Sequence, residues 1–392
     1  MKLGNRITGL TQDGSDGWGV FYKARALKKL GQPIIDLTIG EHDIGTHRDI
    51  LSAMNQSARY GHTGYAAVPG TDALRQTVAQ RIQSRTSVLT EPTNILITPG
   101  GQSALFAAHM AVLDPGDFAL YCDPYYTTYP GTLRSSGAIG RPIQCWAELN
   151  FMPCYQDLNL AANGARSLLV NSPNNPTGVI YDTVTWAGIA KVCNDHDLWL
   201  ISDEVYDTQV WDGYHISPRS INGLEKRTLV VGSMSKSHAM TGSRVGWICG
   251  PEIVIEHLIN LATHTTFGVP GYIQDAANFA LNQGNAVEIE VAAPFKRRRD
   301  IAMDLIARQT VVRAVPCSGA MYIMLDIRAT GLSGDIFAHA LLESKQIAVM
   351  PGESFGKSAL GHVRVAMTVC DAQFIKALEA LLAFAAEYKN AM

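Results

Sequence analysis

The sequence predicts an α/β protein in which a mainly parallel β-sheet lies between helices, together with a smaller α+β domain. Short β-rich runs alternate with helical patterns from about residue 95, and most of these runs are apolar throughout, as in strands buried on both faces. After Pro251 the pattern changes to long helices followed by a second group of short strands. The length of 392 residues also agrees with about two domains.

The larger domain follows a rhythm of strand and helix. Helices are expected over 102–113 and 183–195, and strands are expected at ILIT from 95, FALYC from 118, SLLVN from 167, LWLIS from 198, TLVVGS from 228 and VGWICG from 245. Ligands bind outside the carboxyl ends of the strands in such a sheet. Functional side chains are therefore expected in the loops that follow these runs.

The smaller domain is predicted from the remaining elements, which include a long helix over about 286–308. Its strands are expected at VVRAVP, AMYIMLDI, IAVM and HVRVAM, separated by helices that start near Ser333 and Asp371. The first forty residues, with the run IIDLTIG, are placed beside these strands. The predicted division is a large domain over 46–285 and a small domain formed by 1–45 and 286–392.

Composition and charge exclude several classes of protein. Hydrophobic residues make up 47% of the chain and charged residues 17%, which provides for a large core and argues against disorder. The 32 basic and 35 acidic residues give a net charge of -3, so no broad field attracts nucleic acid or an anionic membrane. The basic run Lys296–Arg299 precedes Asp300 in a helical pattern and is interpreted as a solvated helix face.

Cysteine usage and the lack of long apolar segments predict a cytoplasmic protein. The seven cysteines include no CxxC pair, which fits a reduced compartment better than a disulfide framework. No stretch approaches about 18 uninterrupted apolar residues, and Met1–Gln12 lacks the apolar centre of a leader segment.

The strongest local signal is TLVVGSMSKSHAMTGSRVGW, residues 228–247. An apolar strand leads into a loop of small residues that carries Ser233, Ser235, Lys236 and Arg244. Arginine binds phosphate oxygens with a bidentate fork and hydroxyl groups bind the others, so the loop suits a phosphorylated ligand. Lys236 is then a candidate nucleophile, because nearby positive charge and desolvation lower the pKa of a lysine. Alone, a lysine in a loop is more commonly a solvated surface residue.

Two further motifs place polar side chains after other strands. In LLVNSPNNPTG, residues 168–178, asparagines held beside prolines can aim an amide group at a ligand oxygen. In LWLISDEVY an apolar strand ends at Asp203, Glu204 and Tyr206. A buried carboxylate needs a partner, and a protonated pyridine nitrogen would serve. Each motif alone also fits an ordinary turn.

Two weaker signals suit the anionic parts of a ligand. ITPGGQSALF, residues 97–106, joins a strand, a glycine turn and the start of a helix, where backbone amides and partial positive charge favour phosphate. HVRVAM places Arg364 in an otherwise apolar strand, which makes it a candidate clamp for a carboxylate. A structural ion pair is an equal alternative for this arginine.

The sequence argues against a nucleotide-binding loop and against a metal site. PGESFGKS, residues 351–358, resembles a phosphate loop, but the spacing from Gly352 to Gly356 is one residue too short and Pro351 stands where glycine is needed. The eleven histidines include no HExxH pair and no cluster typical of a metal site, so no metal is expected.

Taken together, NSPNNPTG, SDEVY and SMSKSHAMTGSRVGW, in this order and at these intervals, resemble the class I/II aminotransferases of fold type I, the aspartate aminotransferase superfamily. The resemblance extends from Gly40 to Arg364. It implies a seven-stranded sheet, pyridoxal 5'-phosphate as cofactor, and transfer of an amino group from an L-amino acid to a 2-oxo acid in a ping-pong cycle. HDLWLISDEVY, SKSHAMTG and DIRATGLS are most similar to arginine:pyruvate aminotransferases.

The resemblance implies roles for individual residues. Lys236 is the Schiff-base lysine and general base, and Asp203 is the partner of the pyridinium nitrogen. Asn175 and Tyr206 bond the ring hydroxyl, and Tyr126 stacks on the ring. The phosphate is held by Gly101, Gln102, Ser233, Ser235 and Arg244.

It also implies a substrate clamp and a homodimer. Arg364 grips the substrate carboxylate, and Asn175 and the backbone of Gly40 line the same place. Tyr65, in TGYAAVPG, reaches the cofactor phosphate of the neighbouring subunit, so each site needs two copies of the chain.

Four positions depart from the pattern of the superfamily. Tyr126 stands where tryptophan is common and keeps an aromatic face for stacking. Gln102 stands where relatives carry threonine or lysine, which changes one phosphate contact. Ser243 and His42 replace a common tryptophan and proline near the mouth of the site.

The sequence leaves two questions open: which side chain the substrate carries, and which bond of the substrate breaks. Asp13, Asp16 and Trp18 precede a helix at Phe21, and an acidic residue near the pocket would favour a basic donor such as arginine, with a solvated loop as the alternative. A pyridoxal-phosphate-dependent lyase, for example a C–S lyase, shares the lysine and the phosphate residues and is the alternative activity.

Overall fold

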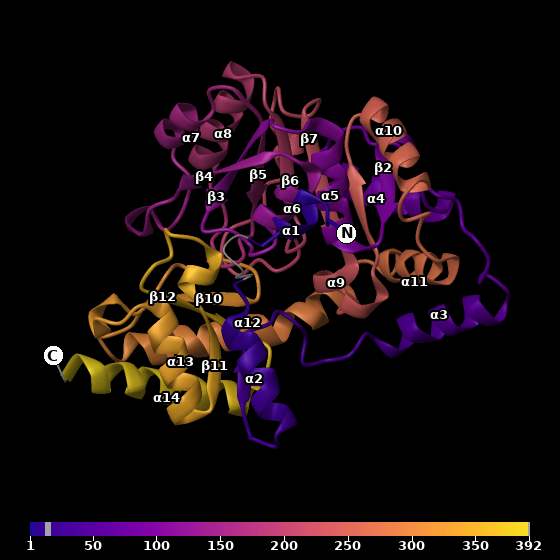
Figure 1. Ribbon diagram of the computed structural model, residues 1–392. Helices are drawn as coiled ribbons and strands as arrows, with labels where there is room; N and C mark the ends of the chain where they lie inside the picture. Colours follow the sequence, from indigo (N-terminus) through magenta and orange to yellow (C-terminus); the bar gives the residue numbers. More distant parts are fainter. Residues whose placement is uncertain (12–16, 391–392) are drawn as a thin grey trace.

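The computed structural model describes residues 1–11 and 17–390 (Figure 1). Asp13 and Asp16, for which the sequence leaves a place near the substrate pocket or in a solvated loop as alternatives, lie outside the described residues. Within the described ranges, no helix is long and apolar enough to cross a membrane.

The larger sheet has seven strands in the order β2-β8-β7-β6-β5-β3-β4. Its strands are β2 (Ile95–Thr98), β3 (Phe118–Asp123), β4 (Ile139–Gln144), β5 (Ala165–Asn171), β6 (Trp199–Asp203), β7 (Thr228–Ser233) and β8 (Gly246–Cys249). Neighbouring strands are parallel except that β8 runs antiparallel to both β2 and β7. The mainly parallel α/β sheet predicted from the sequence is thus confirmed.

Successive residues of the central strands enter different hydrophobic cores. In β6, Leu200 packs into one core while Ile201 packs into another on the opposite face, and Leu168 and Leu169 divide in the same way in β5. Side chains alternate between the faces of a strand, so both faces of this sheet are buried. This explains why the runs are apolar at every position.

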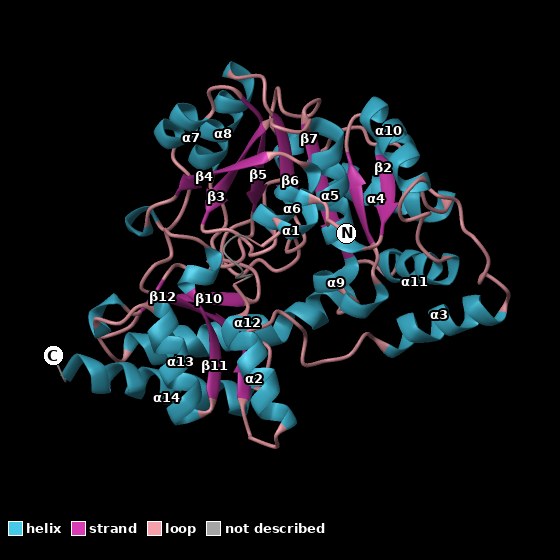
Figure 2. Ribbon diagram, in the orientation of Figure 1, coloured by secondary structure: helices cyan, strands magenta, loops and turns pink. Residues whose placement is uncertain are grey.

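Helices cover both faces of this sheet, as Figure 2 shows. The cores on its two sides include residues of α3 (Arg48–Arg59), α4 (Asp72–Thr86), α5 (Gly100–Val112), α6 (Tyr129–Ser136), α7 (Tyr155–Ala161), α8 (Thr183–Asp195), α10 (Glu252–Thr263) and α11 (Gly271–Asn282). The short helix α1 (Asn5–Thr8) lies near α6, where Arg134 donates to the carbonyl oxygen of Leu10.

The smaller sheet has the order β1-β11-β12-β10-β9. Its strands are β1 (Ile35–Leu37), β9 (Arg313–Ala314), β10 (Tyr322–Asp326), β11 (Ile347–Pro351) and β12 (His362–Ala366). Around it pack α2 (Gly19–Lys29), α13 (Gly334–Lys345) and α14 (Asp371–Asn390). β1 pairs in parallel with β11, which brings the N-terminal segment beside C-terminal strands (Figure 1). The boundaries 45/46 and 285/286 between the two domains stay a prediction.

The long helix α12 (Ala286–Ala307) contributes side chains to two hydrophobic cores, one beside the larger sheet and one beside the smaller sheet. Val287 and Val291 pack with the core of α4 and α11, whereas Phe295 and Ala302 pack with the core of the smaller sheet. Pro294 lies inside the helix, between these two sets. α12 therefore connects the two parts of the molecule through side chains on both sides of a proline.

A buried arginine attaches α12 to the segment that follows β1. The two terminal nitrogens of Arg298 donate to the carboxylate of Asp43 over 2.9 and 2.6 Å, and its Nε donates to Asp371 over 2.8 Å. Such a bidentate pair fixes both position and angle. It holds the segment from Gly40 to Asp43 against α12.

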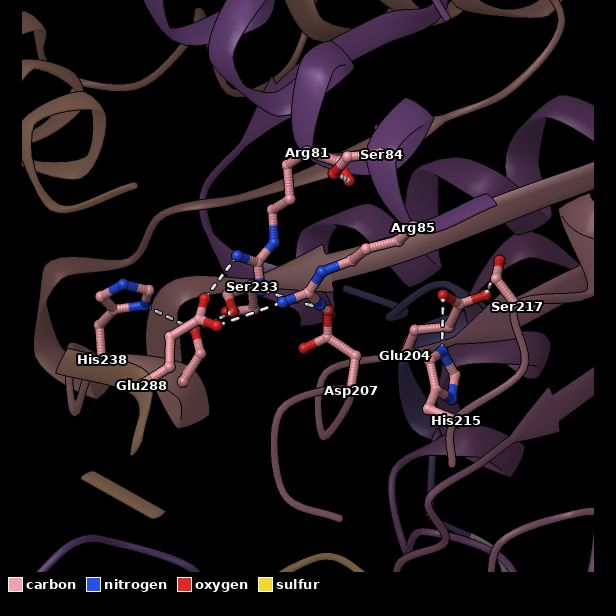
Figure 3. A network of polar contacts seen from close by, with 11 residues as sticks. Arg81, Ser84, Arg85, Glu204, Asp207, His215, Ser217, Ser233, His238 and Glu288 are labelled. Atoms are coloured by element: carbon pink, nitrogen blue, oxygen red, sulfur yellow. Dashed lines mark hydrogen bonds and ion pairs between the residues drawn. The ribbon is translucent and has the colours of Figure 1, made fainter. Parts of the chain in front are cut away.

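A second ion-pair network joins α4, the loop after β6 and α12 (Figure 3). Arg81 and Arg85 of α4 both pair with Asp207 and with Glu288, at 3.3 Å for Arg81–Asp207 and 3.2 Å for Arg85–Glu288. Burial raises the pKa of Asp207, but the charges of Arg85 and Arg81 outweigh it and hold that pKa below its ordinary value. These ion pairs hold Asp207 in place, and with it the segment from Asp203 to Tyr206 that precedes it.

Removing one charge from this network should destabilise the fold. The side chains of Glu288 and Arg81 are only 6% and 13% exposed, so Glu288→Gln leaves the charges of Arg81 and Arg85 with Asp207 as their one shared carboxylate. We expect it to lower the free energy of unfolding by about 3 kcal/mol. Urea unfolding, followed by circular dichroism and by tryptophan fluorescence, measures the change.

The matched control is Glu343→Gln, which breaks an exposed pair with Lys23 and should leave the free energy of unfolding nearly unchanged. Equal destabilisation by the two substitutions would contradict an anchoring role for the buried network.

Candidate active site

A cavity of about 360 Å³ lies beyond the carboxyl ends of β5, β6 and β7. All the site residues predicted from the sequence line it except Tyr65: Gly40, Gly101, Gln102, Tyr126, Asn175, Asp203, Tyr206, Ser233, Ser235, Lys236, Arg244 and Arg364. Trp18, Glu41, Tyr129, Asn171 and Tyr322 line it as well. Segments far apart in the sequence thus meet where the α/β topology places a ligand.

Lys236 lies in α9 (Met234–Ser237), the short helix that follows β7. Its Nζ donates a hydrogen bond to the carbonyl oxygen of Gly40. Burial lowers the pKa of Lys236, and the charges of Arg364 and Arg244 lower it further. A larger fraction of this amine is therefore neutral and nucleophilic than for an ordinary lysine.

Asp203 ends β6, and its side chain is 4% exposed to solvent. Its Oδ2 accepts a hydrogen bond of 2.7 Å from the Tyr129 hydroxyl, and its Oδ1 accepts one of 3.3 Å from the amide of Val205. Burial raises the pKa of Asp203 to about 6. No described residue forms an ion pair with it, so the site has room for a cationic partner of this carboxylate.

The turn after β5 is built by its own asparagines. Asn171 Nδ2 donates to the Asp203 carbonyl oxygen over 2.9 Å, and Asn171 Oδ1 accepts from the amide of Asn175 over 2.8 Å. Asn174 Oδ1 accepts from the amide and the hydroxyl of Thr177. Two of the three asparagines therefore brace the turn, and the third, Asn175, presents its side chain to the cavity.

The hydroxyl group of Tyr206 lies within hydrogen-bonding distance of Asn175 and of a second tyrosine. Asn175 Nδ2 is 3.4 Å from the Tyr206 hydroxyl, and the hydroxyl groups of Tyr206 and Tyr322 are 3.0 Å apart. Burial raises the pKa of Tyr206 well above its ordinary value, so this group is a hydrogen-bond donor and not a phenolate.

The opposite end of the cavity suits an anion. The N-terminus of α5 begins at Gly100, whose φ of +78° and contact with the guanidinium of Arg244 leave no space for a Cβ. Arg244 itself adopts a left-handed conformation with φ 51°. Helix amides, this guanidinium and the hydroxyl groups of Ser233 and Ser235 converge as a phosphate requires.

Arg364 is a buried guanidinium on β12. Its Nη1 donates to Asn175 Oδ1 over 2.8 Å and its Nη2 donates to the Thr38 carbonyl oxygen. Nε is buried and finds no partner among the described residues. The structural ion pair that the sequence left as an alternative is not formed with any described residue, and the guanidinium lines the cavity instead.

Three other positions singled out in the sequence differ from the residues above in their location or in their contacts. Tyr65 is 92% exposed and stands outside the cavity, with its ring 5.1 Å from that of Phe267. Gln102 lines the cavity, but both ends of its amide are bonded, to Thr128 over 3.0 Å and to Thr132 over 2.7 Å. Ser243 lies in a separate pocket together with His42.

His42 also touches the lysine segment. Its Nε2 is 3.0 Å from the carbonyl oxygen of Lys236, and its ring packs against Phe295 of α12. Burial lowers the pKa of His42 to about 4, so the imidazole is neutral near pH 7.

The sequence analysis missed Tyr129 and Tyr322. Tyr129 lies in α6, a helix that was not predicted, and its contact with Asp203 depends on tertiary structure alone. Tyr322 lies in the expected strand AMYIMLDI, where a hydroxyl group among apolar residues is the same kind of signal that identified Arg364.

Comparison with known proteins agrees with this geometry. The family model for aminotransferases of class I and II matches residues 32–381. The arginine–pyruvate transaminase of Pseudomonas aeruginosa is 38% identical, over 94% of this chain and 94% of its own. The aspartate/prephenate aminotransferase of Thermus thermophilus is 32% identical, over 91% of this chain and 92% of its own.

Solved structures show the same fold. The aspartate aminotransferase of Thermus thermophilus with maleate superposes with a TM-score of 0.92 at 31% identity, covering 98% of this chain and 100% of that one. The aromatic aminotransferase of Pyrococcus horikoshii gives 0.87 at 29% identity, with 93% and 99% covered.

These relatives are named for the transfer of amino groups and not for lyase chemistry, so the lyase alternative is not favoured. The buried amine, the carboxylate without a cation and the anion-binding helix end also suit the amine-reactive carbonyl, the pyridine nitrogen and the phosphate of one cofactor. The chain belongs to the class I and II aminotransferases, enzymes that depend on pyridoxal phosphate and transfer an amino group from an amino acid to a 2-oxo acid.

Proposed function

We propose that this enzyme transfers the amino group of arginine to a 2-oxo acid such as pyruvate, as a homodimer in the cytoplasm. The observation that carries the catalytic part is the meeting of Lys236, Asp203 and Arg364 around a single cavity. Each of these side chains has its own part of the reaction, and the three come from separate segments of the chain.

The proposed cofactor contacts are supported by the position of these residues around one cavity. When bound, pyridoxal phosphate supplies a carbonyl that condenses with amines and a ring that accepts an electron pair. Asp203 would bond the ring nitrogen, and Asn175 and Tyr206 would donate to the ring oxygen. Tyr126 would stack on the ring face. The phosphate would be held by Gly101, Gln102, Ser233, Ser235 and Arg244, with Gln102 acting through its backbone because both ends of its side-chain amide are bonded.

Lys236 carries the proton of the reaction. Burial and two nearby guanidinium groups lower the pKa of its amine and so favour the neutral form that a general base requires. The carbonyl of Gly40 orients the amine through the hydrogen bond it accepts. We assign two proton transfers to Lys236: removal of the proton from the substrate Cα and its delivery to the carbonyl carbon of the cofactor.

Arg364 binds the α-carboxylate of the substrate, which is common to all amino donors. The guanidinium is buried and has an Nε without a described partner, so a carboxylate can replace its present contacts. Asn175 bonds the same guanidinium and lies beside the bound carboxylate.

Arginine as the donor rests on the relative named arginine–pyruvate transaminase and on the charges of the cavity. The cations among its described lining residues are Lys236, Arg244 and Arg364, and each has a role toward the cofactor or the α-carboxylate. Among these described lining residues of the single chain, no further cation is left to pair with a second carboxylate. This favours a donor other than a dicarboxylic amino acid.

A homodimer accounts for Tyr65. This tyrosine is 92% exposed in the single chain, and an exposed aromatic side chain of this size is common at interfaces. We assign it to the phosphate of the neighbouring subunit. All seven cysteines are free thiols, which supports a reducing compartment, the cytoplasm.

Replacement of the lysine gives the first test. The wild-type protein with pyridoxal phosphate should show an absorption band of the bound cofactor that arginine converts to the pyridoxamine form, and Lys236→Ala should lose both the band and activity. Titration with arginine, alanine and glutamate identifies the donor. Steady release of a keto acid without the pyridoxamine form would instead support a lyase.

Replacement of the carboxylate gives the second test. Asp203→Asn keeps the shape but removes the charge opposite the ring nitrogen, so we expect kcat to fall by about 100-fold or more, with a much smaller change in KM. The control is Glu204→Gln, which follows Asp203 but bonds His215 and Ser217 instead. Similar losses of kcat in the two variants would refute the assignment.

Hybrid dimers test Tyr65. Tyr65→Ala should lower activity about tenfold or more through one lost contact to a charged phosphate. Chains with Tyr65→Ala and chains with Lys236→Ala carry different tags, and the hybrid is purified by both. If Tyr65 acts across the interface, the hybrid has one intact site and about half of the wild-type activity. An enzyme in which Tyr65 serves its own subunit would show no such recovery.

A further inference from the structure

Tyr322 touches three parts of the cavity, although no role above uses it. It lies in β10 of the smaller sheet and is 2% exposed. Its hydroxyl and its ring meet different residues, so two separate contacts can be considered for this one side chain.

The hydroxyl of Tyr322 lies between Tyr206 and Gly40. It is 3.0 Å from the Tyr206 hydroxyl, and a Cβ at Gly40 would overlap it. The Tyr206 oxygen is also 3.4 Å from Asn175 Nδ2, a donor. When Tyr322 donates as well, both lone pairs of the Tyr206 oxygen are occupied and its proton is directed elsewhere, into the cavity.

The ring of Tyr322 forms one side of a stack around Arg364. The guanidinium carbon is 4.3 Å from the centroid of the Tyr322 ring and 4.4 Å from that of Phe355. Arg364 has no ion-pair partner among the described residues, so the two aromatic faces, together with its hydrogen bonds to Asn175 and Thr38, stabilise its charge and fix its plane. A bidentate bond to a carboxylate requires that plane to be set.

We propose that Tyr322 is a positioning residue with two separable actions. Its hydroxyl orients the donor proton of Tyr206 toward the ring oxygen of the cofactor, and its ring holds Arg364 in the plane that receives the substrate carboxylate. The inference rests on the proposed roles of Tyr206 and Arg364. It adds that one side chain of the smaller sheet sets the geometry of both.

A purely structural tyrosine is the competing explanation, because a buried hydroxyl needs a hydrogen-bond partner in any case. That explanation predicts a loss of stability without a selective change in the cofactor or in substrate binding. Two substitutions separate the possibilities. Tyr322→Phe removes the hydroxyl and keeps the ring, whereas Tyr322→Leu removes both.

The experiment uses the holoenzymes of these variants and two readouts: the pH at which the absorption band of the bound cofactor titrates, and KM and kcat for the amino donor. In Tyr322→Phe the negative charge of the ring oxygen is less stabilised, so the titration midpoint should rise by about half to one pH unit, while KM stays within about twofold. In Tyr322→Leu the same rise should be joined by an increase in KM of about tenfold.

The control is Tyr181→Phe, because Tyr181 is equally buried, at 1% exposed, and lies outside the cavity. It should leave the titration and KM unchanged. The inference is overturned if Tyr322→Phe titrates like this control, or if Tyr322→Leu raises KM no more than Tyr322→Phe does. Failure of the proposed function is distinct, because it would appear in the wild-type protein as the lack of a titrating band.

Discussion

Asp203 carries its carboxylate at the end of a central strand, 4% exposed, with a tyrosine and an amide as donors and no cation among the described residues. Burial of an unpaired charge is costly, and the raised pKa of about 6 expresses that cost. A protonated ring nitrogen, the partner proposed for Asp203, would remove that cost. The other residues of the cavity lie around this carboxylate, which has no cationic partner among the described residues.

Residues that follow Asp203 in the chain are held by polar contacts outside the cavity. Glu204 is bonded by His215 and Ser217, and Asp207 is held by the two arginines of α4 (Figure 3). Residues of one short segment thus point either to the cavity or to a polar network. A buried carboxylate keeps its position only if the segment that carries it cannot relax, and the ion pairs of Asp207 supply that rigidity.

The sequence could predict the strands that cross the centre of the large sheet and most of the residues around the cavity, because parallel strands are apolar throughout and end at the ligand. β4 escaped prediction, since it is an edge strand in which half of the residues are exposed and one is Pro142. Tyr129 escaped for another reason: its side chain reaches Asp203 from a separate helix, and no local pattern records such a contact. The role of Tyr65 depends on a second chain, which a single sequence describes only through resemblance.

The placement of α12 has a consequence for how the molecule unfolds. One half of this helix packs into the core of the larger sheet and the other half into the core of the smaller one. Pro294 removes one hydrogen bond between the halves, but the helix is continuous through it, so melting either half still removes hydrogen bonds from the other. The two cores therefore share a structural unit, and we expect their backbone amides to become open to hydrogen exchange together rather than as two independent foldons.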